Sequence, residues 1–395
     1  MENPATPKEK RTIKTKSKPS WLRQFNDWFH LWIGIAAGIP VIIISLTGCV
    51  LVFESEIGAM LRTKYEVERP AGAHLLPPSV VRAKVLEQLP DMQIRRLWYY
   101  GEGKTVRLSP DNSDSLIFAN PYTGKVLGME DHEDIFEFFD EGHRHLWFSR
   151  EVGSKIVGWS TAIFVVLTIT GLVLWWPKNW TIRELKQAFT IKWSAKFKRV
   201  NYDLHNVLGF YSMIIALLMG FTGLMMSFRF VNKSVLDLLG GATDRGAEVT
   251  AIEAGPTTVP VTMEGKVDLV WELVTTEIGE FKKDEISIHF PKEDAKWIYA
   301  CTDMYEGTWR ELNFDVNTLA LLSNSHAKIS EDTPANWMRR SNLSLHVGTF
   351  GGLFTKWIFF FASLICGTLP ITGFYIWWGK RKKKTGRKVR TSAAG

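Results

Sequence analysis

Four long uncharged, hydrophobic stretches divide the chain of 395 residues. They cover roughly residues 31–53, 156–176, 204–228 and 357–378. Each is long enough for an α-helix to cross the hydrocarbon core of a bilayer, which takes about 20 residues. The pattern therefore predicts an integral membrane protein with four spans in a lipid bilayer. The first stretch is too long for a cleavable signal peptide and no small-residue cleavage site follows it, so we expect it to remain as a span.

Two long polar segments separate the first span from the second and the third from the fourth. Each begins with a helical pattern, at 77–90 in the first segment and at 267–278 in the second, and continues with alternating runs typical of strands. The predicted strands are 93–100, 104–110, 115–128, 285–291, 297–303 and 309–322. Asn120 to Gly124 reads as a turn between two strands. Small and turn-forming residues over 229–260 favour a loop or linker.

The first and third spans share one layout, as do the second and fourth. The shared positions are His30, Gly34, Thr47, Gly48 and Phe53 in the first span and His205, Gly209, Thr222, Gly223 and Phe228 in the third. The second span ends TGLVLWWP and the fourth ends TGFYIWWG, with Thr170-Gly171 and Thr372-Gly373. We predict an internal duplication, and we assign the Thr-Gly pairs to close helix contact alone, because small residues let backbones approach.

The resulting fold class is an α-helical membrane bundle of four transmembrane helices with two extracytoplasmic α+β domains. The predicted boundaries are a tail at 1–27, a span at 28–53, a first domain at 54–142, a span at 143–177, a loop at 178–201, a span at 202–228, a second domain at 229–345, a span at 346–378 and a tail at 379–395.

Charge orients these segments. Residues 1–23, 178–201 and 379–395 hold 7, 7 and 8 Lys or Arg, with only 3 acidic residues between them. The long segments 54–154 and 229–345 are acidic overall. The positive-inside tendency therefore places both termini and the 178–201 loop of a multi-pass protein in the cytoplasm. Attraction to anionic lipid explains the basic tail, so we expect no nucleic-acid partner. The sequence has three Cys and no CxxC pair, which argues against iron–sulfur, structural zinc and dithiol sites.

Five of the nine histidines flank the spans. They are His30 and His205 at the cytoplasmic ends of the first and third spans, and His143, His145 and His346 on the outer side before the second and fourth. A single His at a span end is most simply an interface residue, but ionisable groups at matched depths point to function. Haem iron takes two axial imidazoles and fits among apolar side chains. Zinc usually draws on three or four protein ligands, and a proton relay needs acidic partners within the spans.

We therefore predict two haem b groups per chain, with iron bound by His30 and His205 near the cytoplasm and by His346 with His143 or His145 near the outer face. Gly34 and Gly209 lie four residues after the inner ligands, where a missing side chain leaves room for the ring. His143 and His145 are two residues apart, so on a helix they point about 200° away from each other and only one faces a given haem.

The chain resembles the PepSY-associated transmembrane family over nearly its whole length. The resemblance rests on FHLWIG and LTG, HRHLWF, DLHNVLGF, LSLHVGTFGG, the two TG…WW span ends and FANPYTGKVLG. The motif H-R-x-L, typical of the family, falls on His143-Arg144-His145-Leu146 and favours His143. Within the family the chain resembles bacterial inner-membrane di-haem ferric siderophore reductases, which implies oxidoreductase activity, electron transport in iron transport, and two PepSY-like outer domains.

The expected function is therefore transmembrane electron transfer that reduces Fe(III)-siderophore outside the membrane and releases Fe(II). The electron donor is either a quinol or a cytoplasmic reductase. Trp147, Trp98 and Trp309 are candidates for contact with the chelate, although domain packing explains them equally well. Two alternatives stay open: a haem-free regulatory or sensory membrane protein, and a cytochrome subunit that passes electrons from quinol to another partner.

Overall fold

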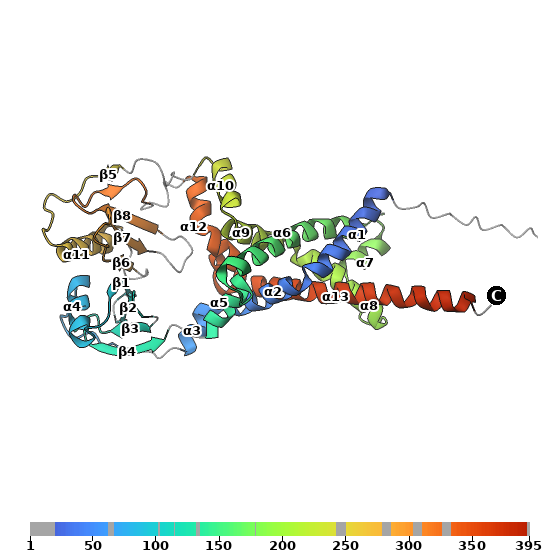
Figure 1. The fold of residues 1–395 in the computed structure, drawn as a ribbon, viewed down its shortest axis with the longest axis horizontal. Coiled ribbons are helices and arrows are strands. Elements are labelled where there is room, and N and C mark those ends of the chain that lie inside the picture. The colour runs from blue at the N-terminus through green and yellow to red at the C-terminus, as the bar shows by residue number, and fades with distance from the viewer. Residues whose placement is uncertain are drawn as a thin grey trace, which may run out of the picture.

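The computed structural model describes residues 20–61, 67–101, 103–113, 115–131, 135–177, 179–241, 250–278, 286–302, 310–325 and 333–392. It consists of an elongated helical bundle with a β-sheet layer at one end (Figure 1). The far end of the bundle holds α7 (Ile182–Phe189), α8 (Phe197–Asp203) and the C-terminal end of α13 (Gly352–Ser392). We call the end of the bundle next to the β-sheet the sheet end and the opposite end the tail end.

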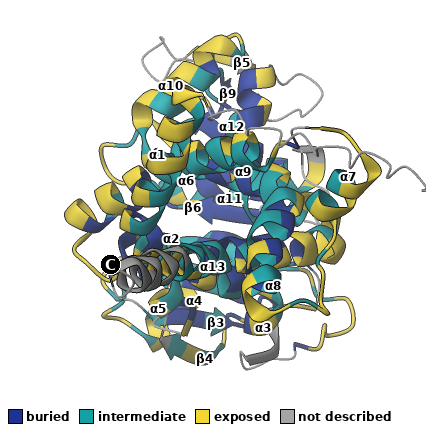
Figure 2. Cartoon of the chain, turned by 90° about the vertical axis from the view of Figure 1, so that its right-hand side faces the viewer, coloured by how far each residue is buried: buried dark blue, intermediate teal, exposed yellow. Residues whose placement is uncertain are grey.

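Three helices within the described residues are long and apolar enough to cross a membrane. They are α6 (Arg150–Trp175), α13, and α9 (Gly209–Ser227) with the preceding α8 and a π-helical turn at Leu204–Leu208. Only 17% to 28% of the residues in their most apolar parts are buried within the protein. Figure 2 shows the contrast between these partly exposed helices and the buried strands. The exposed apolar surface is the part that lipid would cover.

The first span is bent, which the sequence analysis missed. It consists of α1 (Trp21–Ala36) and α2 (Gly38–Leu51), which meet at Ala37 with a bend of 63°. Pro40 gives the reason. A proline has no N–H for the carbonyl four residues earlier, here Ala36, and its ring clashes with that carbonyl.

The second and fourth spans also begin later than predicted. His143 lies on a separate helix, α5 (Ile135–His145), and His346 lies on α12 (Pro334–Val347). Residues with left-handed backbone end both of these helices: Leu146 and Trp147 follow α5 (φ 54° and 58°), and Gly348 follows α12 (φ 83°). Such residues commonly end a helix. The span helices α6 and α13 therefore start only after these breaks.

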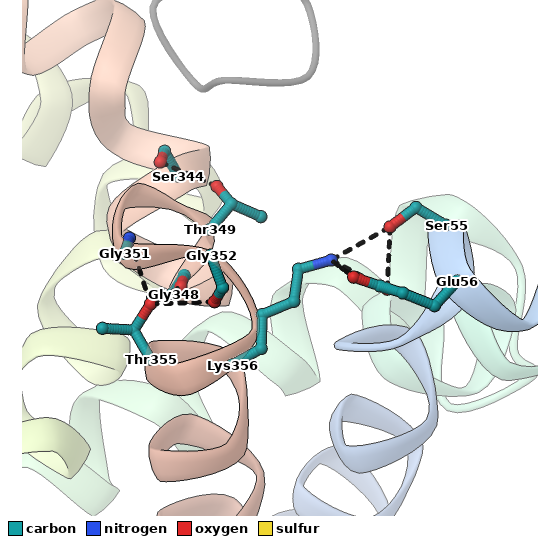
Figure 3. Close-up of polar contacts among 9 residues, drawn as sticks. All are labelled: Ser55, Glu56, Ser344, Gly348, Thr349, Gly351, Gly352, Thr355 and Lys356. Atoms are coloured by element: carbon teal, nitrogen blue, oxygen red, sulfur yellow. Dashed lines mark hydrogen bonds and ion pairs between the residues drawn. The ribbon is translucent and has the colours of Figure 1, made fainter.

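A buried ion pair holds the start of α13. Lys356 is 6% exposed, and its Nζ donates to Ser55 Oγ at 2.9 Å and to Glu56 Oε1 and Oε2 at 2.8 and 2.9 Å. Ser55 and Glu56 belong to α3 (Glu54–Leu61), which follows the first span. The contact joins the first and fourth spans at the sheet end of the bundle (Figure 3).

The two outer segments have the predicted helices and strands, but their strands join into one sheet. The helices are α4 (Pro78–Gln88) and α11 (Met263–Leu273). The strands are β1 (Ile94–Tyr99), β2 (Val106–Pro110), β3 (Ser115–Ala119), β4 (Val126–Asp131), β5 (Ala251–Glu253), β6 (Ile286–His289), β7 (Trp297–Thr302), β8 (Arg310–Asp315) and β9 (Leu321–Leu322). Their order among the described residues is β4-β3-β2-β1-β6-β7-β8-β9-β5, with antiparallel neighbours throughout. The β1–β6 pair makes the join, so the prediction of two separate domains misses this long-range pairing.

One face of the sheet packs on α4 and α11, which lie on the side away from the bundle (Figure 1). Val81 and Val85 of α4 and Val267 and Val270 of α11 are fully buried in a core shared with Leu97 and other strand residues. The opposite face is turned toward the sheet end of the bundle.

Two local predictions have clear outcomes. The turn at Asn120–Gly124 is confirmed, because Asn120 Oδ1 accepts from the backbone N–H of Tyr122 and Thr123 at 2.9 and 3.1 Å. The loop predicted over 229–260 is wrong in its first part, which forms α10 (Arg229–Leu238). Apolar residues of this helix pack against Met225 and Met338, and that helical spacing is hidden beside the Gly-rich stretch after it.

Candidate functional site

His30 and His205 face each other toward the tail end of the bundle. His30 lies on α1 and His205 lies in the π-helical turn that leads into α9. Their ring centroids are 6.4 Å apart, with the ring planes at 90°. π-Helical turns occur frequently at functional sites. We call these two residues the inner pair.

His143 and His346 form an equivalent outer pair nearer the sheet. Their ring centroids are 6.1 Å apart and their planes meet at 67°. His145, the other candidate, is buried elsewhere: its Nδ1 lies 3.2 Å from Glu141 Oε2 on the same helix. The structure therefore brings four of the five candidate histidines into two pairs and leaves His145 outside both.

Each paired histidine contacts a threonine of the neighbouring span through Nδ1. The Nδ1–Oγ1 distances are 2.9 Å for His30–Thr170, 2.9 Å for His205–Thr372, 3.2 Å for His143–Thr47 and 2.9 Å for His346–Thr222. These are the threonines of the four Thr-Gly pairs. Assigning those pairs to helix packing alone is therefore wrong, since all four threonines hydrogen-bond a histidine.

The imidazoles are the donors in these hydrogen bonds, because the threonine hydroxyls donate their own protons to backbone carbonyls. Thr372 Oγ1, for example, donates to the carbonyls of Thr368 and Leu369, both at 3.0 Å. Its oxygen is then free to accept from the imidazole. His143 Nδ1 also lies 2.9 Å from the Ile44 carbonyl, which can only accept.

Ile44 lies three residues before Thr47, the threonine that His143 contacts. Each of the other three rings likewise has a second partner in the backbone three residues before its own threonine. These partners are Leu167 for His30, Leu369 for His205 and Met219 for His346. A carbonyl acceptor assigns the proton to Nδ1 and leaves the lone pair on Nε2. Nε2 is the atom that a neutral histidine then offers to a metal, with the Nδ1 hydrogen bond fixing the ring.

The glycine of each Thr-Gly pair gives the imidazole its space. A Cβ added at Gly171 would lie 3.2 Å from His30 Cε1, and one added at Gly373 would lie 3.3 Å from His205 Cε1. The corresponding distances are 3.1 Å for Gly48 and His143 and 3.3 Å for Gly223 and His346. Even an alanine would require the ring to shift by a few tenths of an ångström. The threonine therefore orients the histidine, and the glycine lets it approach.

Asparagine strengthens three of the four contacts. Asn26, Asn201 and Asn342 each precede a paired histidine by four residues, which is one helical turn. Their side-chain amides donate to the backbone carbonyls of Thr170, Thr372 and Thr222 at 3.2, 3.0 and 3.3 Å. The corresponding residue before His143 is Phe139, so this site lacks the amide contact.

The contacts follow one rule in both halves of the chain, of which the first contains the first two spans and the second contains the last two. Each histidine is held by a threonine of its own half, whereas the imidazole that it faces comes from the other half. The sequence contained a signal for this arrangement: four Thr-Gly pairs match four histidines at matched depths. Without a structure, nothing in it showed which pair serves which histidine.

A cavity of about 660 Å³ surrounds the inner pair. Four glycines line it: Gly34, Gly171, Gly209 and Gly373. The two glycines predicted to leave room beside the inner histidines therefore border open volume. Other lining residues are mostly apolar, and Arg23, Gln24, Asp27, Tyr202 and Asn206 add polar groups. The volume lies within the range of about 300–1,000 Å³ typical of small-molecule sites.

The spacing of both pairs fits two imidazoles on one metal ion. A metal–imidazole bond is about 2.0–2.1 Å long. Because a ring nitrogen lies about 1.2 Å from the ring centre, two imidazoles on opposite sides of an ion have centroids about 6.4 Å apart. The observed separations are 6.4 and 6.1 Å. Among the described residues no group of three or more His, Cys, Asp or Glu could hold a metal. At the inner pair, two imidazoles, a mostly apolar cavity and glycine-lined walls suit haem iron better than tetrahedral zinc.

The three tryptophans named from the sequence have different positions. Trp147 folds back on α5, where its Nε1 donates to the Phe138 carbonyl at 2.9 Å, so it has a packing role. Trp98 lies on the sheet face turned toward the bundle. Trp309 lies outside the described residues, as do His132 and His326.

Comparison with known proteins identifies the family. The family model for the PepSY-associated TM region matches residues 28–380, so the chain belongs to that family. No curated protein matches the chain. The family match and the apolar helices together make this a multi-pass membrane protein.

Proposed function

We propose that this protein transfers electrons across the bilayer to a ferric siderophore, with two resident haem b groups held by His30 and His205 and by His143 and His346. One observation carries the proposal: two facing imidazole pairs at different depths, each ring fixed by the same Thr-Gly device. His205 and Thr222, which contacts the outer pair, are 17 residues apart on one span (222 − 205). At a rise of 1.5 Å per residue, the two sites are roughly 25 Å apart along the bundle.

The chain's own groups perform defined tasks in this function. Nε2 of each paired histidine would bind iron, and Thr170, Thr372, Thr47 and Thr222 hold the Nδ1 protons. The mostly apolar lining of the inner cavity would cover the faces of the ring. When bound, the haems supply one-electron redox chemistry, with potentials that depend on axial ligands, hydrogen bonds and burial.

The proposed direction runs from the tail end to the sheet end. The described parts of the basic segments 178–201 and 379–395 lie at the tail end (Figure 1), which supports a cytoplasmic location of this end by the positive-inside tendency. Both termini would then be cytoplasmic, and the sheet would be periplasmic in a bacterial inner membrane. The donor is a quinol or a cytoplasmic reductase.

The reaction at the sheet end is a one-electron reduction. Fe(III) in the chelate gains the electron that the donor loses, and the resulting Fe(II) is released. Hard oxygen ligands hold Fe(III) more tightly than Fe(II), so reduction weakens the complex. The siderophore is thereby freed of its metal without covalent change.

Purified full-length protein tests this function. We expect a red preparation with a low-spin Soret band, about two haems per chain, and reoxidation of the dithionite-reduced protein when a ferric siderophore is added without oxygen. A colourless protein made with an adequate haem supply would instead support the haem-free regulatory alternative. Haem without reoxidation by any ferric chelate would favour a cytochrome subunit that serves another partner.

A further inference from the structure

The sheet face turned toward the bundle carries a basic and aromatic surface. We call it the Trp98 face and define it by Arg96, Trp98, Arg107, His289 and Tyr299. Trp98 pairs directly with Arg107 across β1 and β2, and Arg96 pairs with His289 across β1 and β6. Directly paired residues in antiparallel strands share a face. The apolar core residues that alternate with them point the other way, toward α4 and α11.

The indole of Trp98 is close to two cations and to an imidazole. The guanidinium carbons of Arg107 and Arg96 lie 4.5 and 6.0 Å from its ring centroid. His289 contacts the same indole edge-on at a centroid distance of 6.2 Å and packs on Tyr299 at 4.8 Å. The surface therefore combines aromatic rings, inclined to one another, with positive charge.

The charges on this face are only partly balanced by the described residues. Arg96 shares Asp111 with Arg95, at 3.6 Å between Arg96 Nη2 and Asp111 Oδ1. Arg107 has no carboxylate partner in the described part of the chain. Burial, together with the positive charge of Arg96 and Arg95, lowers the pKa of His289 to about 4, so this ring stays neutral near pH 7. Among the described residues, the two arginines therefore give this face an excess of positive charge.

Three N–H donors on this face also lack acceptors. They are Trp98 Nε1, Arg96 Nε and Arg107 Nε, which are buried without a hydrogen-bond partner among the described residues. A buried donor without a partner costs about 1–3 kcal/mol. Such groups usually indicate an acceptor that completes the site, such as a water, an ion or a ligand.

A row of directly paired residues connects the face with the bundle. From Trp98 it runs to Ser287 on β6, Cys301 on β7 and Glu311 on β8. Three strand spacings of about 4.8 Å make this roughly 14 Å. Glu311 Oε2 forms an ion pair at 3.3 Å with Arg339 Nη2 of α12.

The same helix, α12, carries His346 of the outer pair. Arg339 and His346 are seven residues apart, so they lie on one side of the helix, about 10 Å apart along its axis. The Trp98 face is therefore attached to the helix that supplies an outer ligand. An electron acceptor seated on this face would lie on the outer side of the bundle, joined to the outer pair through β6, β7, β8 and α12.

We propose that the Trp98 face binds the ferric chelate and that it selects anionic chelates with aromatic, catecholate-type ligands. The assignment rests on the proposed function and adds the substrate class to it. Catecholate rings offer aromatic faces to Trp98 and Tyr299, and their anionic oxygens can accept from Arg96 and Arg107. A neutral hydroxamate chelate of similar size lacks both the charge and the rings.

Equilibrium binding to the full-length protein tests the inference. The protein is placed in nanodiscs of neutral phosphatidylcholine, without reductant, and titrated with radioactive iron held by a trianionic tris-catecholate, a neutral tris-hydroxamate or the non-aromatic EDTA anion. We expect the catecholate complex to bind at least about tenfold more tightly than the other two, with an affinity that falls as salt rises. Equal binding of the hydroxamate complex would overturn the proposal.

Variants locate the site. Arg107→Gln and Trp98→Leu should each weaken catecholate binding by at least about tenfold, and Arg107→Lys should restore part of the loss because it keeps the charge. Lys125→Gln removes the same charge from an exposed turn of the same sheet layer and should bind as the parent does. Wild-type affinity in folded Arg107→Gln and Trp98→Leu would also overturn the proposal.

Measuring binding and reduction separately distinguishes the two levels of inference. Selective binding by a protein without haem would support the Trp98 face and reject the proposed electron transfer. Rapid reduction of both chelates, unaffected by Arg107→Gln, would support electron transfer and reject the selectivity.

Discussion

Replacement of Thr372 by valine tests whether the Thr-Gly pairs hold the histidines for a metal. Valine keeps the branched shape of threonine but removes Oγ1, which accepts from His205 Nδ1 at 2.9 Å. The imidazole keeps the backbone of Leu369 as a second partner, so the loss is partial. We expect a cost of about 1.4 kcal/mol, within the range for one hydrogen bond, which weakens haem binding at the inner site about tenfold.

Haem titration of apoprotein, followed at the Soret band, measures this change. Thr372→Ser should bind nearly as the parent does, because the hydroxyl is kept. Thr368→Val is the matched control: this threonine lies one turn earlier on α13 and donates only to the Ile365 carbonyl, at 2.7 Å. If Thr372→Val and Thr368→Val bind haem equally well, then the threonine does not position His205 and the reasoning fails.

Three further predictions address the ligands, the bundle and the sheet. His205→Ala should lower the haem content from about two to about one per chain, whereas His145→Ala should leave it unchanged; pyridine haemochrome assay measures both, and a loss in His145→Ala would contradict the outer pair. Glu56→Gln leaves the buried ammonium of Lys356 without its counter-charge and should destabilise the protein by about 2 kcal/mol, a value reduced because the Glu56 side chain is 31% exposed; thermal unfolding in detergent tests this, and an unchanged midpoint would refute it. Burial and nearby arginines lower the pKa of His289 to about 4. Between pH 6.5 and 4 the unfolded chain therefore binds more protons than the folded protein does. The free energy of unfolding should fall by up to about 3 kcal/mol as the pH falls through that range. His289→Gln should flatten this part of the pH profile, and a slope equal to that of the parent would show that another group causes it.

The sequence was sufficient for features that depend on local pattern. Uncharged runs indicated the spans, and alternation indicated most strands. Equal offsets from His30 and His205 indicated their common depth. The choice between His143 and His145 needed the structure, because the two differ only in the direction in which α5 presents them.

The features that were missed depend on contacts between distant residues. Thr170 and His30 are 140 residues apart, and no local pattern links them. The β1–β6 pair joins strands of two segments that a pair of spans separates in the sequence. The bend at Ala37 is different in kind, since Pro40 is visible in the sequence and was outweighed by the continuous hydrophobic run around it.

The reciprocal contacts give the two halves of the bundle different roles in each site. His30 is oriented by Thr170 of its own half. Its partner His205 comes from the other half, so a complete pair exists only when the halves are packed together. In the proposed function, each haem therefore binds the assembled bundle and not a separate half. A ligand that binds only the native state stabilises it by RT ln(1 + [L]/Kd), which is about 2.7 kcal/mol at one hundred times Kd. Haem would thus stabilise the interface between the halves, and loss of either pair should weaken this interface as well as the electron path.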